Sequence, residues 1–118
     1  MFSPAFNDQV LSLLSGRQIG VRLHDGPPGP IGLGHLLTHM AYTQFSFPVD
    51  STIENLTEVF FDRVQFDGFA SMVSLWNPAG GLAPEFILCA PFPEMRLHAL
   101  DSVSVSPHGF RISLTSIS

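Results

Sequence analysis

The sequence predicts a mainly β protein, and three observations support this. The 118 residues include ten glycines and ten prolines, which together exceed the usual share of about 12% and break helices. Eleven residues are Phe, which suits pleated surfaces. Short apolar segments recur between turn residues, as in antiparallel sheets. We therefore expect one domain over 1–118: an antiparallel β-sandwich, jelly-roll-like, of about seven or eight short strands with one short N-terminal α-helix.

The N-terminal segment, residues 3–15, has the one clear helical pattern of the sequence. Ser3 can cap a helix, Pro4 suits its first turn, and Gly16 can end it. The apolar residues at helical spacing form one stripe, which we expect to dock on the sheet or on a neighbouring subunit. These interface candidates are Phe6, Val10, Leu13 and Leu14.

After Gly16 the apolar period changes to two, which predicts strands and loops over 17–116. Ile19, Val21 and Leu23 form the first strand, which leads into a loop rich in glycine and proline. We expect a turn at 91–93, where a Phe lies between two prolines. Further strands are predicted at 40–47, 53–61, 63–66, 69–77, 84–91, 95–100, 102–106 and 110–116. In the last of these, the residues expected to face the core are Phe110, Ile112 and Leu114.

The segment 26–49 carries no Asp, Glu, Lys or Arg and is too apolar for an ordinary solvent loop. We therefore expect it to lie against a neighbouring chain. Trp76, at the end of an uncharged strand, is expected to be a core or subunit-interface aromatic, although an exposed Trp there could instead bind sugar. The further interface candidates are Leu33, Leu36, Leu37, Tyr42 and Trp76.

The charge balance disfavours several classes of partner. Ten acidic residues face five Arg and no Lys, giving a net charge of −5, so we expect no binding to nucleic acid or to an anionic membrane. No apolar run predicts a membrane-spanning helix. Charged residues make up 13% of the chain, about half the usual ~25%. This shortage favours a surface covered by other protein chains.

The chemically reactive residues do not form a convincing catalytic motif, so we expect no enzyme activity, no cofactor and no metal. His35 and His39 have zinc-pair spacing if helical, but no Glu follows His35 as a general base. Cys89 lies in an apolar strand and is expected to be a buried structural thiol. His24, at a strand end, is expected to tie down the proline loop by hydrogen bonds.

Several short motifs resemble those of small tail, tail-fibre-like and minor virion structural proteins of tailed bacteriophages. In that family a first strand ends Leu-His-Thr-x-x-Pro-Gly, and residues 23–29 here read Leu-His-Asp-Gly-Pro-Pro-Gly. The Gly-Tyr-Ala-Arg motif that usually follows keeps only its Tyr, at Tyr42, and Leu100-Asp101 replaces a usual Gly-Asp. The order of later elements also agrees: an apolar strand at 69–77, the pair Gly80-Gly81, a strand entering a proline at 86–91, and a final strand at 110–116.

This resemblance implies a structural component of the virion, in the tail, neck or fibre-attachment region, made in the host cytoplasm. Its expected partners are copies of itself, in a symmetric homo-oligomer, and other virion proteins. Two other classes stay open. One is a carbohydrate- or receptor-binding module that uses Trp76 or Tyr42. The other is a small cupin-like enzyme with a metal held by His24, His35, His39 or His98.

Overall fold

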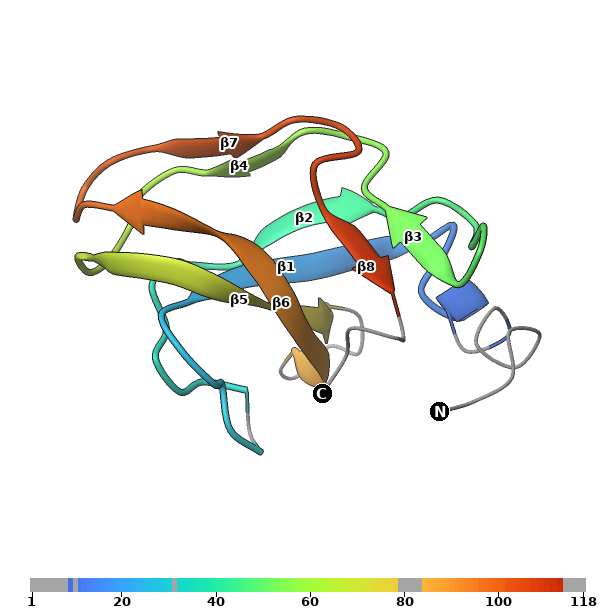
Figure 1. The fold of residues 1–118 in the computed structure, drawn as a ribbon, viewed down its shortest axis with the longest axis horizontal. Helices are drawn as coiled ribbons and strands as arrows, with labels where there is room; N and C mark the ends of the chain where they lie inside the picture. Colours follow the sequence, from blue (N-terminus) through green and yellow to red (C-terminus); the bar gives the residue numbers. More distant parts are fainter. Residues whose placement is uncertain (1–8, 10, 31, 79–83, 114–118) are drawn as a thin grey trace.

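The computed structural model describes residues 9, 11–30, 32–78 and 84–113. This part of the chain is mainly β, and all of its strand pairs are antiparallel, as predicted (Figure 1). Its strands are β1 Gln18–His24, β2 Ala41–Gln44, β3 Thr52–Glu54, β4 Val59–Phe61, β5 Gly68–Asn77, β6 Glu85–Leu97, β7 Val103–Val105 and β8 Arg111–Ser113.

The strands form one four-stranded sheet, ordered β2-β1-β5-β6, and two two-stranded ribbons, β3–β8 and β4–β7. The last six strands pair in a nested order, β5 with β6, β4 with β7 and β3 with β8. This is the pairing of one long hairpin folded over on itself. Figure 1 shows the β4–β7 ribbon running above the four-stranded sheet.

The hydrophobic core draws on the sheet and on both ribbons. On β1 the alternation predicted from sequence holds, with Ile19, Val21 and Leu23 all buried. Phe110 and Ile112 are buried as predicted, while Leu114 lies outside the described residues. On β1 and β8 the buried apolar residues thus lie on one face of the strand, which stabilises the pairing register against slippage.

The predicted helix over 3–15 is not seen. Much of it, including Phe6 and Val10, lies outside the described residues. In the described remainder the chain makes only about one helical turn. Backbone N–H groups there donate to carbonyls three residues back, as from Leu14 to Leu11 at 3.0 Å.

The predicted apolar stripe is wrong at one position in this turn. Leu11 and Leu14 are buried in the core, whereas Leu13 is 71% exposed. Ser15 then bridges to Phe45, so the segment runs beside the end of β2 instead of continuing as a helix. Because the turn is tight and short, Leu11 replaces Leu13 on the buried side.

Two of the predicted strands, 53–61 and 63–66, are wrong. The segment 53–61 divides into β3 and β4 because Asn55 bonds the backbone of a different segment and turns the chain. Residues 63–66 make only an isolated bridge, between Val64 and Thr38.

The predicted turn at 91–93 is also wrong, since β6 runs straight through both prolines. Proline cannot donate to a ladder, but β6 is an edge strand of its sheet, where this is tolerated. The register shifts between Ala70 and Met72, so that three β6 residues stand opposite one residue of β5. This bulge accommodates the proline-rich stretch without ending the strand.

The loop between β1 and β2 packs in part on its own sheet, and contact of segment 26–49 with a neighbouring chain stays a prediction. Leu37 N–H donates to Leu23 O at 2.9 Å, and Asp25 N–H donates to His35 O at 2.8 Å. Leu37 is buried, and Gly32 lies directly against Trp76. The apolar residues of this loop are therefore partly covered by the chain itself.

Candidate functional site

A buried polar cluster links the loop to the sheet. The His24 ring lies between the two, with Nδ1 2.8 Å from Gly34 O and Nε2 2.6 Å from Ser74 Oγ. Trp76 Nε1–H donates to the same Ser74 oxygen at 2.8 Å. The sequence-based prediction that His24 ties down the proline loop is thus confirmed.

The hydrogen bonds fix the tautomer of His24. A carbonyl only accepts, so Nδ1 carries the proton that is donated to Gly34, and Nε2 accepts from the Ser74 hydroxyl. Burial lowers the pKa of His24 from its usual value, and nearby Arg22 and His35 lower it further, although the bond to Gly34 opposes this. The ring is therefore neutral near pH 7.

The His24–Ser74 hydrogen bond resembles that of an activated serine nucleophile, but Ser74 is not accessible to a substrate from solvent. Both side chains are completely buried, and the lone pairs of the Ser74 oxygen face the Trp76 indole. A substrate would need the loop to open before it could reach Ser74. In this closed arrangement the cluster fastens the loop.

Trp76 is 5% exposed, so the interpretation as a core aromatic is confirmed and an exposed sugar platform at this residue is wrong. Its ring packs at a tilt on Phe86, with centroids 5.4 Å apart. The Arg22 guanidinium carbon lies 4.6 Å from the Trp76 ring centre. Arg22 Nε is buried and has no hydrogen-bond partner.

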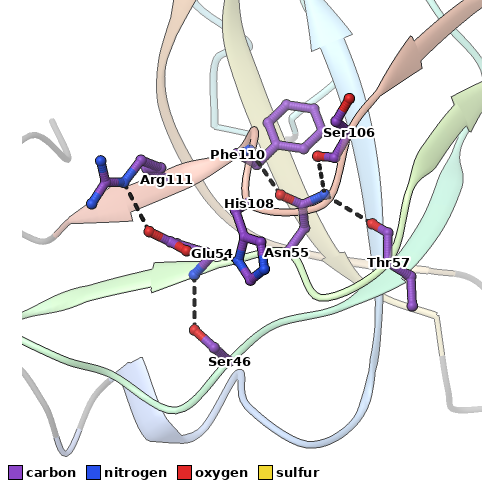
Figure 2. A network of polar contacts seen from close by, with 8 residues as sticks. All are labelled: Ser46, Glu54, Asn55, Thr57, Ser106, His108, Phe110 and Arg111. Atoms are coloured by element: carbon purple, nitrogen blue, oxygen red, sulfur yellow. Dashed lines mark hydrogen bonds and ion pairs between the residues drawn. The ribbon is translucent and has the colours of Figure 1, made fainter.

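A second polar cluster joins the β3–β8 ribbon to neighbouring turns (Figure 2). Asn55 is fully buried, and its Nδ2 donates to Thr57 O at 2.8 Å and to Ser106 O at 3.0 Å. Its Oδ1 accepts from Phe110 N–H at 2.8 Å. This role was not predicted from the sequence, although Asn is typical of turns because its side chain bonds nearby backbone groups.

Beside Asn55, Glu54 holds a small surface ion cluster. Its carboxylate lies 2.8 Å from His108 Nδ1 and 2.9 Å from Arg111 Nε, while Ser46 Oγ accepts from the Glu54 N–H. Arg111 and His108 are both largely exposed. Such exposed pairs contribute little stability, so their main effect is to set the charge of this surface.

The other candidate catalytic and metal-binding residues are not brought together. The segment with His35 and His39 is not helical, and both residues are exposed, with His39 accepting from the Gln65 amide. Within residues 9, 11–30, 32–78 and 84–113, no three His, Cys, Asp or Glu residues are placed to hold a metal ion. Cys89, expected to be buried, is half-buried on the edge strand β6.

The structure separates the interface candidates into three groups. Leu13, Leu33 and Tyr42 are exposed and Leu36 is half-buried, so these side chains remain accessible to a partner. The buried candidates, which have almost no free surface, are Leu14, Leu37 and Trp76. Phe6 and Val10 lie outside the described residues.

Two exposed apolar residues that were not among the interface candidates flank Pro48. Phe47 and Val49 are each 71% exposed, as Leu13 is. The chain just before them runs beside residues 15–16, because Ser15 Oγ donates to Ser46 O at 2.8 Å and Gly16 N–H donates to Phe45 O. We call Phe47 and Val49 the apolar tip. The signal was present in the sequence as apolar residues flanking Pro48 within a turn.

In comparisons with protein families, curated proteins and solved structures, none matched the chain. Among the described residues, no helix has the length and apolar character needed to cross a membrane.

Proposed function

We propose that this chain is a structural subunit of a tailed-bacteriophage particle, in the tail, neck or fibre-attachment region, and that it works through contacts with copies of itself and other virion proteins. The resemblance of its short motifs to those of small virion proteins supports this, as does the low content of charged residues. Under this proposal the chain needs no reaction chemistry of its own.

The observation that carries the proposal is the apolar tip. Its two side chains are mostly in solvent, next to the place where residues 15–16 are bonded to residues 45–46. Phe47 and Val49 also line an open groove with Asp50, Glu54 and Arg111. An apolar centre with a charged rim is the usual composition of a protein interface.

We propose a second copy of the chain as the occupant of the apolar tip. The rim carries both signs of charge, Asp50 and Glu54 beside Arg111. In a contact with two-fold symmetry, the same patch on both copies can place Arg111 of each near an acidic residue of the other. The apolar tip then becomes buried without leaving a large excess of one charge.

We also propose that the whole arrangement is a jelly-roll-like sandwich. The nested pairing of β3–β8, β4–β7 and β5–β6 supports this, because a jelly roll is a long hairpin rolled up on itself. Such folds place loops at their ends, where subunits of a shell or tail can meet. An experimental structure of the complete chain tests this part of the proposal.

Sedimentation velocity over a range of concentrations tests the self-contact. We expect the natural chain to self-associate, and the double variant Phe47→Ser/Val49→Ser to do so at least about tenfold more weakly. Phe66→Ser is the matched control, because Phe66 is also exposed but lies just before β5, away from the apolar tip. A natural chain that stays monomeric at high concentration would contradict the self-contact.

Mass spectrometry of purified particles tests the virion role separately. We expect peptides of this chain in tailed particles purified from a culture that carries its gene at the natural locus. Particles that contain the other tail proteins in full but never this chain would contradict the proposal.

A further inference from the structure

A shallow depression on the outer face of β1 and β2 has the composition of a small ligand site. Tyr42 and Gln44 are exposed on β2, while Ala41 and Thr43, which alternate with them along the strand, are buried. The side chains that line the depression are all neutral: Gln18, Tyr42, Thr43, Gln44 and Thr57. It lies on a different part of the surface from the groove of the apolar tip.

The polar groups of this depression are largely free to bind. Gln18 stands directly opposite Gln44 in the β1–β2 pair, so the two amides are neighbours. Neither amide, nor the Tyr42 hydroxyl, bonds another described residue. Thr43 and Thr57 are already joined by a hydroxyl–hydroxyl bond of 2.7 Å. A bound molecule would therefore meet two amides that both donate and accept, next to an exposed aromatic ring.

A partly buried cation lies next to Tyr42 on the same face. Gly20 stands opposite Tyr42, and Arg22 follows on β1, about 7 Å further along the strand. Its guanidinium rests on Trp76, and its Nε is buried without a partner. The ion pairs of the described chain involve Glu54, so no described carboxylate neutralises Arg22.

We propose that this face binds a saccharide that carries a carboxylate. The Tyr42 ring would stack on the apolar C–H face of a sugar, and the Gln18 and Gln44 amides would bond its hydroxyls. Arg22 would pair with the carboxylate, because a guanidinium matches that group with two parallel hydrogen bonds. A neutral sugar would leave Arg22 unpaired, so the acidic sugar is the better match.

Titration of the full chain with two matched disaccharides tests the proposal. The probes are a disaccharide ending in glucuronic acid and the glucose disaccharide of the same linkage, measured by calorimetry and saturation-transfer NMR. We expect millimolar binding of the acidic sugar and at least about tenfold weaker binding of the neutral one. Equal binding of the two sugars, or no binding of either, would overturn the proposal.

Variants assign the binding to these residues. Tyr42→Ala should abolish binding of both sugars, while Arg22→Gln should reduce the acidic sugar to the level of the neutral one. Phe60→Ala, at an exposed aromatic of β4, is the matched control and should change nothing. If Arg22→Gln fails to fold, the surface variant Gln18→Ala/Gln44→Ala should still weaken both sugars. Unchanged binding in Tyr42→Ala would overturn the proposal.

Two further arms separate this site from a peptide-binding site and from the apolar tip. A peptide of glutamate residues that binds through Arg22 without needing Tyr42 would show an acidic protein segment as the ligand and would overturn the saccharide. The Phe47→Ser/Val49→Ser variant should bind the acidic sugar as the natural chain does. If the natural chain binds the acidic sugar but does not self-associate, the self-contact fails. If it self-associates but does not bind the sugar, the saccharide proposal fails.

Discussion

The Asn55 side chain joins three separate parts of the chain. It bonds the turn at Thr57, the end of β7 near Ser106 and the start of β8 at Phe110. No water reaches it, because the residue is fully buried. A replacement that removes its amide donor loses both of these bonds, although Thr57 O also accepts from the Thr43 hydroxyl and Ser106 O from Gly109 N–H.

We therefore predict that Asn55→Asp destabilises the fold by about 3 kcal/mol, because it removes two donors and buries a charge. Chemical denaturation measures the change in the free energy of unfolding. Gln18→Glu makes the same amide-to-acid change at an exposed site and should stay within about 0.5 kcal/mol of the natural chain. A similar loss in both variants would show that added negative charge, and not the Asn55 bonds, is responsible.

His24 makes stability depend on pH in a defined direction. Its pKa is lowered in the fold, chiefly by burial, with Arg22 and His35 adding to the effect. As the pH falls below the ordinary value of about 6.5, the unfolded chain takes up a proton that the folded chain refuses. Stability should therefore be full above that pH, fall as the pH drops below it, and level off below the folded-state pKa.

Thermal melting between about pH 7.5 and pH 5 checks this prediction. His24→Gln should be less stable than the natural chain but should lose this component of the pH dependence. His98→Gln, at an exposed histidine, should keep it. An unchanged pH dependence in His24→Gln would show that other groups are responsible.

At the scale of elements, the loop between β1 and β2 packs closely against aromatic residues of the sheet. Gly32 has a φ of +76°, and a Cβ there would lie 2.5 Å from Phe86 Cδ1 and 2.9 Å from Trp76 Cζ2. Gly29 has nearly the same φ, +77°, but nothing lies within 4 Å of its Cβ position. Substitutions at these two glycines therefore distinguish the cost of backbone strain from the cost of steric crowding.

We predict that Gly29→Ala costs about 1 kcal/mol from strain alone, and that Gly32→Ala costs about 2–3 kcal/mol, since it adds a clash. Denaturant midpoints measure both. Trp76 is the one Trp of the chain, so its fluorescence should shift in Gly32→Ala and not in Gly29→Ala. Equal costs with equal spectra would show that Gly32 is not packed against the aromatic pair.

The sequence predicted elements where the local pattern decides the structure and failed where distant partners do. The alternation of β1 and the hydrogen-bonding role of His24 could be anticipated because each depends on nearby residues. The passage of β6 through Pro91 could not, because it depends on this strand lying at the edge of its sheet. Similarly, the break between β3 and β4 follows from the bonds of Asn55 to residues 51 and 55 positions away.

The candidate surfaces were predictable in part for the same reason. Leu33 and Tyr42 were named as interface candidates and are exposed, whereas Leu13 was expected to dock with Leu14 and is exposed instead. Trp76 lost its free surface because the β1–β2 loop folds back over the sheet, which no local pattern indicates. The position of the apolar tip depends on residues 15–16 running beside residues 45–46, a contact that links separate parts of the sequence.

At the scale of the whole molecule, the net negative charge and the exposed apolar side chains have opposite effects on self-association. Each chain carries a net charge of −5, so two copies repel each other at long range. The apolar tip attracts at contact, and salt does not weaken burial of its side chains. The charged rim is exposed, so its pairs contribute little.

We therefore predict that self-association strengthens as sodium chloride rises from low concentration to about 0.5 M, where the screening length is only a few ångströms. Sedimentation velocity at several salt concentrations measures the association constant. Phe47→Ser/Val49→Ser should remove most of the association at every salt concentration, because the repulsion remains while the apolar attraction is lost. A natural chain whose association weakens steadily with salt would instead be joined through its ion pairs, with Arg111 and Glu54 as the residues to substitute next.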